Sequence, residues 1–417
     1  MSPCPFKNIL DPDIYIGGGH HALFAEVREQ SGGLAYIEDP IAGVPYWAVM
    51  QRDLADYVCK HPLLFSSAAK TILPKEMPEE ELALSRLMLV NMDPPEHVKY
   101  RRIVRNAFTP KAVQGYEARF REVARETIDA IAAKGECEFV TDVAAELPLI
   151  AILSLCGIPM QDKQQFFDWT NTMIFTEDED MSGENGVAAS QAAAIEVYAY
   201  AAALAEKHKT EPLTDIVGAL LDGTVNDEKL TADEFQLFFL MLIAAGNEST
   251  RSVIAHGMRL LIEHPEQLRK LVDDPALIPY AVEEVLRYNP AFVQMRRTVM
   301  ADVELQGQQL RAGDKMVLNW QAINHDPEIF ENPAQFDVER FRNNPELANQ
   351  HRAFGNGEHF CIGAHMSRLE MQVMFEEIIP RLKNPRFAAP VDYVRDYFVN
   401  SIKAMPLQFD PETTAQA

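Results

Sequence analysis

The segment from Phe354 to Gly363 reads FGNGEHFCIG and combines closely spaced glycines with one cysteine, Cys361. The glycines predict a tight, irregular loop, and Ala364–Ile379, which follows, has the pattern of an amphipathic helix. Cys361 would then lie at a helix N-terminus, where free N–H groups and the helix dipole favour a thiolate over a thiol. Such a thiolate suits a strongly donating axial ligand to haem iron. The alternative is a buried cysteine that acts as a small hydrophobic residue.

A second motif whose residues could take part in a reaction reads AGNEST and runs from Ala245 to Thr250. Gly246 lies within a helical pattern, where glycine costs about 1 kcal/mol relative to alanine and is tolerated if a ligand must approach the backbone. Glu248 is followed by two hydroxyl residues, Ser249 and Thr250. A hydroxyl beside an acid can kink the helix and hold water molecules that deliver protons. The alternative is that these are polar positions of a partly exposed helix.

Charged residues occur at helical spacing in two further places. Glu284 and Arg287 are three residues apart, which places both side chains on one helix face. His97 and Arg101 are four residues apart, in a segment that begins after a proline turn. From spacing alone, both pairs are typical of solvent-exposed helix surfaces.

Together these motifs resemble those of the cytochrome P-450 family in its soluble bacterial form. The loop matches the haem-binding loop of that family at Phe354, Gly357, His359, Cys361 and Gly363. The residue at position 358 is a glutamate, whereas the family often has an aromatic or other apolar residue there, and we expect it to tune the loop without abolishing ligation. Family-like strings continue to position 400, so the resemblance covers nearly the whole chain.

The resemblance implies structural roles for several charged residues. Glu284 and Arg287 would lock against Arg340 of a later meander and organise the loop that presents Cys361, without touching the substrate. Charge-assisted hydrogen bonds would hold the carboxylates of the haem. The basic residues that match this second role are His97, Arg101, Arg297 and His359.

The resemblance also implies the reaction: one oxygen atom of dioxygen enters an unactivated C–H bond, the other leaves as water, and two electrons are supplied. The cofactor would be one haem b held by Cys361. Glu248 and Ser249 would relay protons; the family usually has threonine at position 249, so Thr250 is an alternative hydroxyl. An apolar substrate of the hydrocarbon, terpenoid, fatty-acid or steroid class is expected. By position relative to the motifs, the pocket residues would be Met241, Ala244, Ala245, Phe292, Val293, Phe398 and Val399.

Two other functions remain open. A peroxygenase of the same fold would use hydrogen peroxide, but members of that kind replace the acid–alcohol pair that Glu248-Ser249 retains here. A non-catalytic haem protein would bind or sense a ligand, and no sensor, DNA-binding or signalling segment is recognisable in the sequence.

Helical patterns dominate the chain between residues 95 and 290 and would position these motifs. The clearest helix begins at a capping box at Thr231 and runs to about His264, roughly 50 Å at 1.5 Å per residue. The acidic stretch 176–185 is predicted to be a mobile loop. Short strands are predicted at 46–50, 303–305 with 309–310, 315–318 and 404–409. We expect one domain over residues 1–417 with the triangular-prism P-450 fold, mainly α with small β-sheets.

The composition is that of an ordinary globular protein, with 417 residues, 47% hydrophobic and 24% charged, and a formal net charge of −24. That charge disfavours nucleic acid and anionic membranes as partners. Five widely spaced cysteines without a C-x-x-C pair argue against disulfides or a zinc site. Residues 1–11 show no signal-peptide pattern, and the longest apolar runs are shorter than a membrane span. We expect a cytoplasmic monomer.

Basic residues cluster locally despite the acidic total. They fall in the predicted helix after Pro95 and around the cysteine loop, which is the side on which electrons would reach the haem. This pattern predicts a positive patch that steers a small acidic iron–sulfur ferredoxin, itself reduced by an NAD(P)H-dependent reductase. The predicted patch residues are Lys99, Arg101, Arg102, Arg105, Lys111, His351, Arg352 and Arg368.

Overall fold

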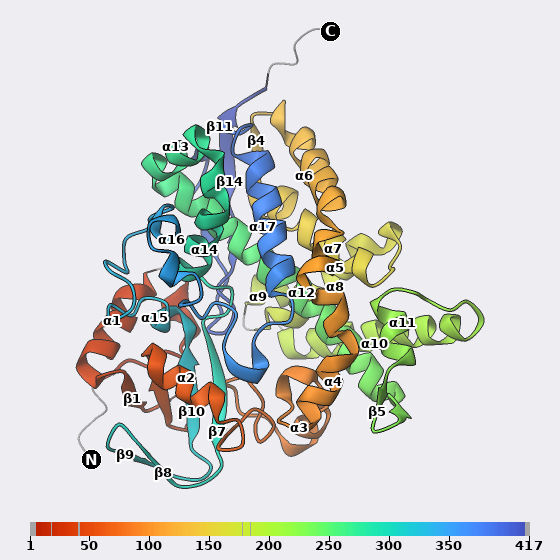
Figure 1. The fold of residues 1–417 in the computed structure, drawn as a ribbon, viewed down its shortest axis with the longest axis vertical. Coiled ribbons are helices and arrows are strands. Elements are labelled where there is room, and N and C mark those ends of the chain that lie inside the picture. Colours follow the sequence, from red (N-terminus) through yellow and green to blue (C-terminus); the bar gives the residue numbers. More distant parts are fainter. Residues whose placement is uncertain (1–5, 18, 41, 177, 184, 413–417) are drawn as a thin grey trace.

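The computed structural model describes residues 6–17, 19–40, 42–176, 178–183 and 185–412, and most of them are helical (Figure 1). In chain order, the helices are α1 (His20–Ser31), α2 (Arg52–Lys60), α3 (Glu79–Ser85), α4 (Glu96–Val104), α5 (Pro110–Gln114), α6 (Glu117–Ala132), α7 (Glu146–Leu155), α8 (Lys163–Ile174), α9 (Glu179–Ser182), α10 (Gly186–Thr210), α11 (Ile216–Asp222), α12 (Ala232–Glu263), α13 (Pro265–Asp273), α14 (Ile278–Tyr288), α15 (Trp320–Ile323), α16 (Arg340–Asn343) and α17 (Ala364–Ile378). The strands are β1 (Leu34–Ile37), β2 (Tyr46–Val49), β3 (Phe65–Ser66), β4 (Glu136–Glu138), β5 (Thr224–Val225), β6 (Glu228–Lys229), β7 (Gln294–Val299), β8 (Val303–Leu305), β9 (Gln308–Leu310), β10 (Lys315–Asn319), β11 (Lys383–Phe387), β12 (Asp392–Tyr393), β13 (Ile402–Ala404) and β14 (Pro406–Asp410).

The long helix α12 runs through the middle of the molecule (Figure 1). Its start is fixed by the predicted capping box, because Thr231 Oγ1 accepts from the Glu234 N–H at 3.3 Å and the Glu234 carboxylate accepts from the Thr231 N–H at 2.7 Å. It packs against α7, α8, α10, α14 and α17. The prediction of a single long helix over this segment is confirmed, and residues on this helix can therefore face several different neighbours.

The largest sheet contains five strands in the order β1-β2-β10-β7-β3 and lies beside the helices. β10 pairs in parallel with β2 and antiparallel with β7, so strands from distant parts of the sequence form one sheet. The predicted strands at 46–50, 303–305 with 309–310, and 315–318 correspond to β2, β8 with β9, and β10. The strand predicted over 404–409 corresponds to β14, except that Ala404 ends β13, which belongs to a different sheet, and Met405 separates the two.

The segment predicted as a mobile loop at 176–185 contains a short helix, α9, although positions 177 and 184 lie outside the described residues. Asp178 caps it by accepting from the Asp180 N–H at 3.1 Å. Lys403 forms ion pairs of 2.9 Å with both aspartates. The prediction missed these contacts because Lys403 is more than 200 positions away in the sequence.

Within the described part of the chain, α10 is the one helix whose length and composition would allow it to cross a membrane. Its mean hydropathy is 1.2 over the best 18-residue window, of which 17% is buried. In this structure it packs along α8 and α12.

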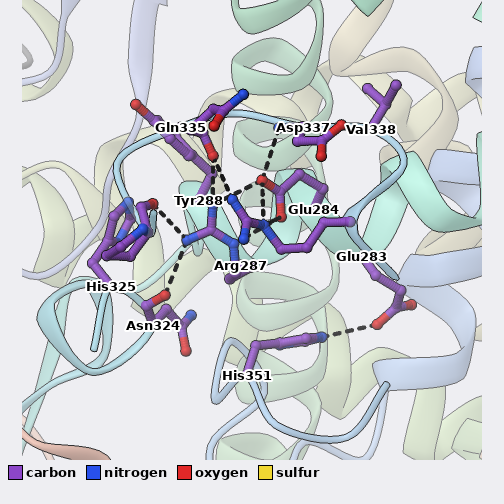
Figure 2. A network of polar contacts seen from close by, with 12 residues as sticks. Glu283, Glu284, Arg287, Tyr288, Asn324, His325, Gln335, Asp337, Val338 and His351 are labelled. Atoms are coloured by element: carbon purple, nitrogen blue, oxygen red, sulfur yellow. Dashed lines mark hydrogen bonds and ion pairs between the residues drawn. The ribbon is translucent and has the colours of Figure 1, made fainter. Parts of the chain in front are cut away.

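A buried network of charged groups joins α14 to the segment that leads to Cys361 (Figure 2). Arg287 donates two hydrogen bonds of 2.7 and 2.8 Å to the Glu284 carboxylate, which also accepts from Arg340 Nε at 3.1 and 3.2 Å. Glu284 and Arg287 are fully buried. The structure thus brings together the three side chains that the sequence analysis grouped.

The two guanidinium groups also bind the backbone of the segment before α16. Arg287 donates to the carbonyl groups of Asn324 and Pro333 at 3.1 and 2.9 Å, and Arg340 donates to those of Glu331 and Gln335 at 2.6 and 2.8 Å. Buried backbone carbonyl groups that would otherwise lack donors are satisfied in this way. The network therefore fixes the path of an irregular segment.

Replacing Glu284 with Gln should lower the free energy of unfolding by about 3–5 kcal/mol, because two buried guanidinium groups lose their counter-charge. Urea unfolding would measure the loss. Glu263→Gln is the matched control: its ion pair with Arg259 is also within one helix, but Glu263 is exposed, so the cost should be below about 1 kcal/mol. Equal losses in the two variants would contradict the structural role of Glu284.

Candidate active site

A cavity lies between α12 and the loop that carries Cys361. The space inside it that the centre of a water molecule can reach is about 240 Å³. Its wall is mostly apolar, with residues from α7, α12 and the segments around them that include Leu89, Phe108, Ile152, Leu155, Leu242 and Met295.

Cys361 lines this cavity and directly precedes α17. Its N–H donates to the Phe354 carbonyl group at 2.9 Å, which closes the loop on itself. A Cβ atom added to Gly363 would lie 3.9 Å from the Cys361 sulfur, so glycine leaves the space beside the sulfur open. The sequence prediction of a tight loop followed by a helix is confirmed.

The loop is held against α2 by close packing and by charge. Gly357 has φ = +70°, and a Cβ atom there would lie 2.5 Å from the Cys59 carbonyl oxygen. Arg352 binds Asp56 through hydrogen bonds of 2.7 and 2.8 Å, and Asn356 donates to the same carboxylate at 2.6 Å. Gly357 therefore serves the contact with α2 and does not line the cavity.

A second set of contacts ties the loop to α14 and α17. The Arg368 guanidinium lies 4.6 Å from the centre of the Phe354 ring and binds the Glu283 carboxylate at 2.6 and 2.9 Å. Glu283 also accepts from His351 at 2.8 Å (Figure 2). Glu283 is adjacent to Glu284. The same turn of α14 therefore holds Arg340, before the cysteine loop, and His351 and Arg368, on either side of it.

The pKa of Cys361 differs from the sequence prediction. Burial raises the pKa of the thiol above its ordinary value, while the Gly363 N–H and the guanidinium groups of Arg101 and Arg368 act to lower it. Desolvation of the charge therefore opposes the donors at the helix N-terminus. A coordinated metal ion would favour the thiolate.

Four basic residues line one part of the cavity: His97, Arg101, Arg297 and His359. The rings of His97 and His359 lie 4.1 Å apart, and the buried Nδ1 atom of His97 has no hydrogen-bond partner among the described residues. Burial lowers the pKa of His97 to about 4, and burial together with Arg297 and His97 lowers that of His359 to about 2. In the protein alone both imidazoles are neutral, although the sequence analysis treated them as cations.

Comparison with known proteins decides what this site is. The family model for Cytochrome P450 matches residues 171–384. A steroid C26-monooxygenase of Rhodococcus jostii is 32% identical over 96% of this chain and 84% of its own length. A methyl-branched lipid omega-hydroxylase of Mycobacterium tuberculosis is 36% identical over 95% of this chain and 92% of its own. This chain belongs to the cytochrome P450 family.

Solved structures agree with this assignment. A cytochrome P450 of Mycobacterium marinum in complex with pseudoionone superimposes with a TM-score of 0.88 at 30% identity, covering 98% of this chain and all of the other. The expected P450 fold, mainly α with small sheets, is therefore confirmed. The protein is a P450 monooxygenase, and its cofactor is haem b.

The residues of this P450 fit that cofactor. Within the described residues, no group of three or more His, Cys, Asp or Glu side chains could hold a metal ion. Cys361 would hold the iron of a haem, whose porphyrin supplies further ligands to the metal. The N–H groups of Arg101 and Arg297, with the unpartnered His97, suit the two carboxylates of haem b. Bound haem supplies the activation of dioxygen.

The predicted relay residues face different ways in this P450. Ser249 and Thr250 line the cavity, and Glu248 does not. Glu248 is buried, forms an ion pair with Arg251 and accepts from Ser401 at 2.9 Å. That Glu248 and Ser249 relay protons stays a prediction, with Glu248 placed in a buried charge network off the cavity wall.

The predicted substrate pocket is found only in part. Met241, Ala245 and Phe292 line the cavity. Phe398 lies behind Phe292 with ring centres 5.1 Å apart, and Val399 pairs with Phe292 in an isolated β-bridge. The predicted residues that do not line the cavity are Ala244, Val293, Phe398 and Val399.

The contribution of α7 to the cavity was not predicted from the sequence. Ile152 and Leu155 line the cavity, and a Cβ atom on Gly246 would lie 2.9 Å from two carbon atoms of Ile152. Gly246 therefore admits the side chain of a neighbouring helix, in addition to facing the cavity. The sequence of α7 is apolar on all faces, so it indicated burial but gave no sign of which face meets α12.

Replacing Cys361 with His should abolish the red-shifted Soret band of the ferrous–CO complex, because that band requires a thiolate on the iron. Visible spectra of the reduced, CO-treated variant would test this. Cys59→Ala is the matched control, because Cys59 lines the same cavity, and it should keep the band. A band that survives in the Cys361 variant would mean that another residue ligates the iron.

Proposed function

We propose that this P450 hydroxylates a C–H bond of a largely apolar substrate, of the steroid or branched-lipid class, with electrons from an acidic ferredoxin. The observation that carries the proposal is the apolar wall of the cavity above Cys361. Two curated relatives are named for steroid and methyl-branched lipid oxidation, which supports the same class. In this proposal Met241, Ala245 and Phe292, which lie on the wall, contact the substrate.

The charged groups of the cavity favour an uncharged substrate. The cationic part of the wall is formed by Arg101 and Arg297, which would face the haem carboxylates. The other polar side chains on the wall include three hydroxyls, one amide, two imidazoles and the carboxyl group of Glu370. A substrate carboxylate or ammonium near the reacting carbon would lose its hydration without gaining a counter-charge there.

A preferred substrate should therefore be apolar around the oxidised carbon. Titration with a steroid and with a branched fatty acid should shift the iron spin state, because an apolar ligand displaces water from the iron. A matched compound with a full charge close to the expected site of oxidation should give no shift. Tighter binding of the charged compound would contradict the proposal.

The surface on the Cys361 side supports a smaller docking patch than the sequence predicted. Arg102, Arg105 and Lys111 are exposed and form no ion pair among the described residues. Arg101 bonds to a backbone carbonyl group instead of a carboxylate. The other four predicted members are already paired with carboxylates, and for all but Lys99 the partner comes from a segment that spacing could not connect. These pairs are Lys99 with Glu96, His351 and Arg368 with Glu283, and Arg352 with Asp56.

Apolar groups are exposed next to these cations. Arg101 donates to the Phe360 carbonyl group at 2.5 Å, so α4 lies against the loop that precedes Cys361. Val98 and Phe360 are 52% and 41% exposed. An apolar centre with a cationic rim is typical of a transient docking surface that relies on electrostatic steering.

Reversing Arg102 or Arg105 to Glu should slow reduction by an acidic ferredoxin and weaken the salt dependence of the rate, because steering acts through exposed charge. Stopped-flow reduction would measure the rate, and substrate affinity should not change. Lys134→Glu, an exposed cation beyond the end of α6, is the control and should leave the rate unchanged. Rates that respond to neither the reversals nor salt would exclude this docking face.

A further inference from the structure

Four histidine side chains gather where α1 packs on the rest of the molecule, and we call them the histidine cluster. His20 and His21 begin α1, His256 lies on α12, and His325 follows α15. His20, His256 and His325 are 4%, 1% and 8% exposed, and His21 is half-buried. None of the four lines the cavity above Cys361.

The rings of the cluster form a continuous row with two tyrosines. The centre of the His20 ring lies 4.9 Å from that of Tyr15 and 5.0 Å from that of His21. The His21 ring lies 4.7 Å from that of His325, which in turn lies 5.0 Å from the ring of Tyr288 at the end of α14. A charge on one imidazole would therefore act on the next at close range.

The hydrogen bonds of the cluster suit neutral imidazoles. The Gln321 Nε2 group, which can only donate, faces His21 Nε2 at 3.3 Å. Arg259 Nε, also a donor, faces His256 Nδ1 at 3.4 Å. Both of these ring nitrogens therefore act as acceptors, which a protonated imidazole cannot do because both of its nitrogens carry hydrogen.

Other nitrogen atoms of the cluster have no partner. Neither nitrogen of His20 has a hydrogen-bond partner among the described residues, and the same holds for Nε2 of His256 and Nε2 of His325. Within the part of the chain that the structure describes, these rings do not form a metal site either. Protonation would therefore add a charge and a donor to buried rings that have nothing to donate to.

No carboxylate balances a positive charge on these rings within the described residues. Three arginines add positive charge instead: Arg28 of α1, Arg259 of α12 and Arg287 of α14. The nearby phenols are those of Tyr15, Tyr288 and Tyr393, and burial raises the pKa of each. The carboxylates of the surrounding elements are held by other groups: Glu263 by Arg259, Glu284 by Arg287 and Arg340, Asp326 by the N–H groups of Arg52 and Glu328, and Asp396 by those of Phe398 and Val399.

These surroundings lower the pKa of every histidine in the cluster. Burial, which disfavours the charged ring, lowers the pKa of His20 to about 4 and that of His21 to about 3. Burial also lowers the pKa values of His256 and His325, with Arg259 and His21 as the next causes. All four rings are therefore neutral at pH 7.

The docking of α1 depends on this neutral state. The helix lies at the edge of the molecule against β1 and α15 (Figure 1). Its buried residues are His20, Phe24 and Val27, and Arg28 donates to the Ala322 carbonyl group of α15 at 2.8 Å. One of the three side chains that dock α1 is therefore a group that water would protonate in mild acid.

The cluster also lies beside the support of the cysteine loop. Asn324, the residue before His325, accepts from Arg287 through its carbonyl group at 3.1 Å. Its side-chain oxygen accepts from the Arg352 N–H at 2.6 Å. Release of α1 would therefore remove packing from a segment on which the cysteine loop depends.

We propose that the histidine cluster is an acid-sensitive switch that docks α1 against α14 and α15 and releases it when the pH falls. In the closed state the rings are neutral and packed together. In the open state His20 and His21 are in water and take up one proton each. The proposal does not depend on the hydroxylase function proposed above, because none of the four rings lines the cavity.

The direction of the pH effect follows from the lowered pKa values. A histidine in water has a pKa of 6.5, so below that pH the open state binds more protons than the closed state. Docking is therefore strongest above pH 6.5 and weakens as the pH falls toward about 4, where His20 gains a proton in the closed state as well. The ratio of open to closed molecules should rise about 5-fold per histidine between pH 6.5 and 5.5, or about 30-fold for two.

Hydrogen exchange of the haem-loaded protein, followed by mass spectrometry, tests the switch. After correction for the intrinsic pH dependence of exchange, opening of α1 should increase about 30-fold or more between pH 6.5 and 5.5. The amide groups of α6, a helix without histidine, should show no such increase. A response of α1 below about 5-fold would mean that opening takes up too few protons, and an equal response in α6 would mean global unfolding. Either result would overturn the proposal.

Two variants keep an aromatic ring but cannot bind a proton. His20→Phe and His21→Phe should each lower the pH response of α1 about 5-fold, and the double variant should lower it about 30-fold. His61→Gln is the matched control, because His61 is an exposed histidine after α2, and it should keep the full response. A full response in the double variant, or its loss in the control, would also overturn the switch. The wild-type measurement decides by itself if a Phe variant does not fold.

Discussion

The structure depends on how it neutralises charge that it has buried around α14. The Glu284 carboxylate lies between two guanidinium groups, and none of these ions has enough contact with water to be stable alone. Since the remaining N–H groups of Arg287 and Arg340 bind backbone carbonyls, neutralising the charge also fixes an irregular stretch of chain. That stretch leads directly to the cysteine loop, so the position of the iron ligand follows from an electrostatic requirement elsewhere.

Charge is also buried at the cavity, but there the buried groups are basic. Its basic residues crowd together, and burial and neighbouring arginines lower the pKa of both imidazoles, those of His97 and His359. An anionic group would balance these basic residues, and the carboxylates of haem b would suit them. Such carboxylates would favour the charged form of both rings.

Features carried by adjacent residues or by helical spacing could be predicted from the sequence: the loop at Cys361, the capping box at Thr231 and the pairing of Glu284 with Arg287. Features that depend on how distant segments meet could not. Glu248 accepts a hydrogen bond from a serine more than 150 positions away. The pairing of His351 and Arg368 likewise depends on a carboxylate of α14, and the sequence contains no periodicity that links these segments.

The contact between Gly246 and Ile152 has a consequence for how such an enzyme changes its substrate range. The glycine lets α7 approach α12 until the isoleucine side chain touches the backbone at the cavity wall. Cavity volume is therefore adjustable at position 152 by ordinary aliphatic exchange, for which an isoleucine-to-valine step costs only about 0.5–1.5 kcal/mol of stability. Position 246 offers no such freedom, because any larger residue would force the two helices apart. Divergence within this lineage, or selection in the laboratory, would accordingly proceed through α7 while the glycine stays unchanged.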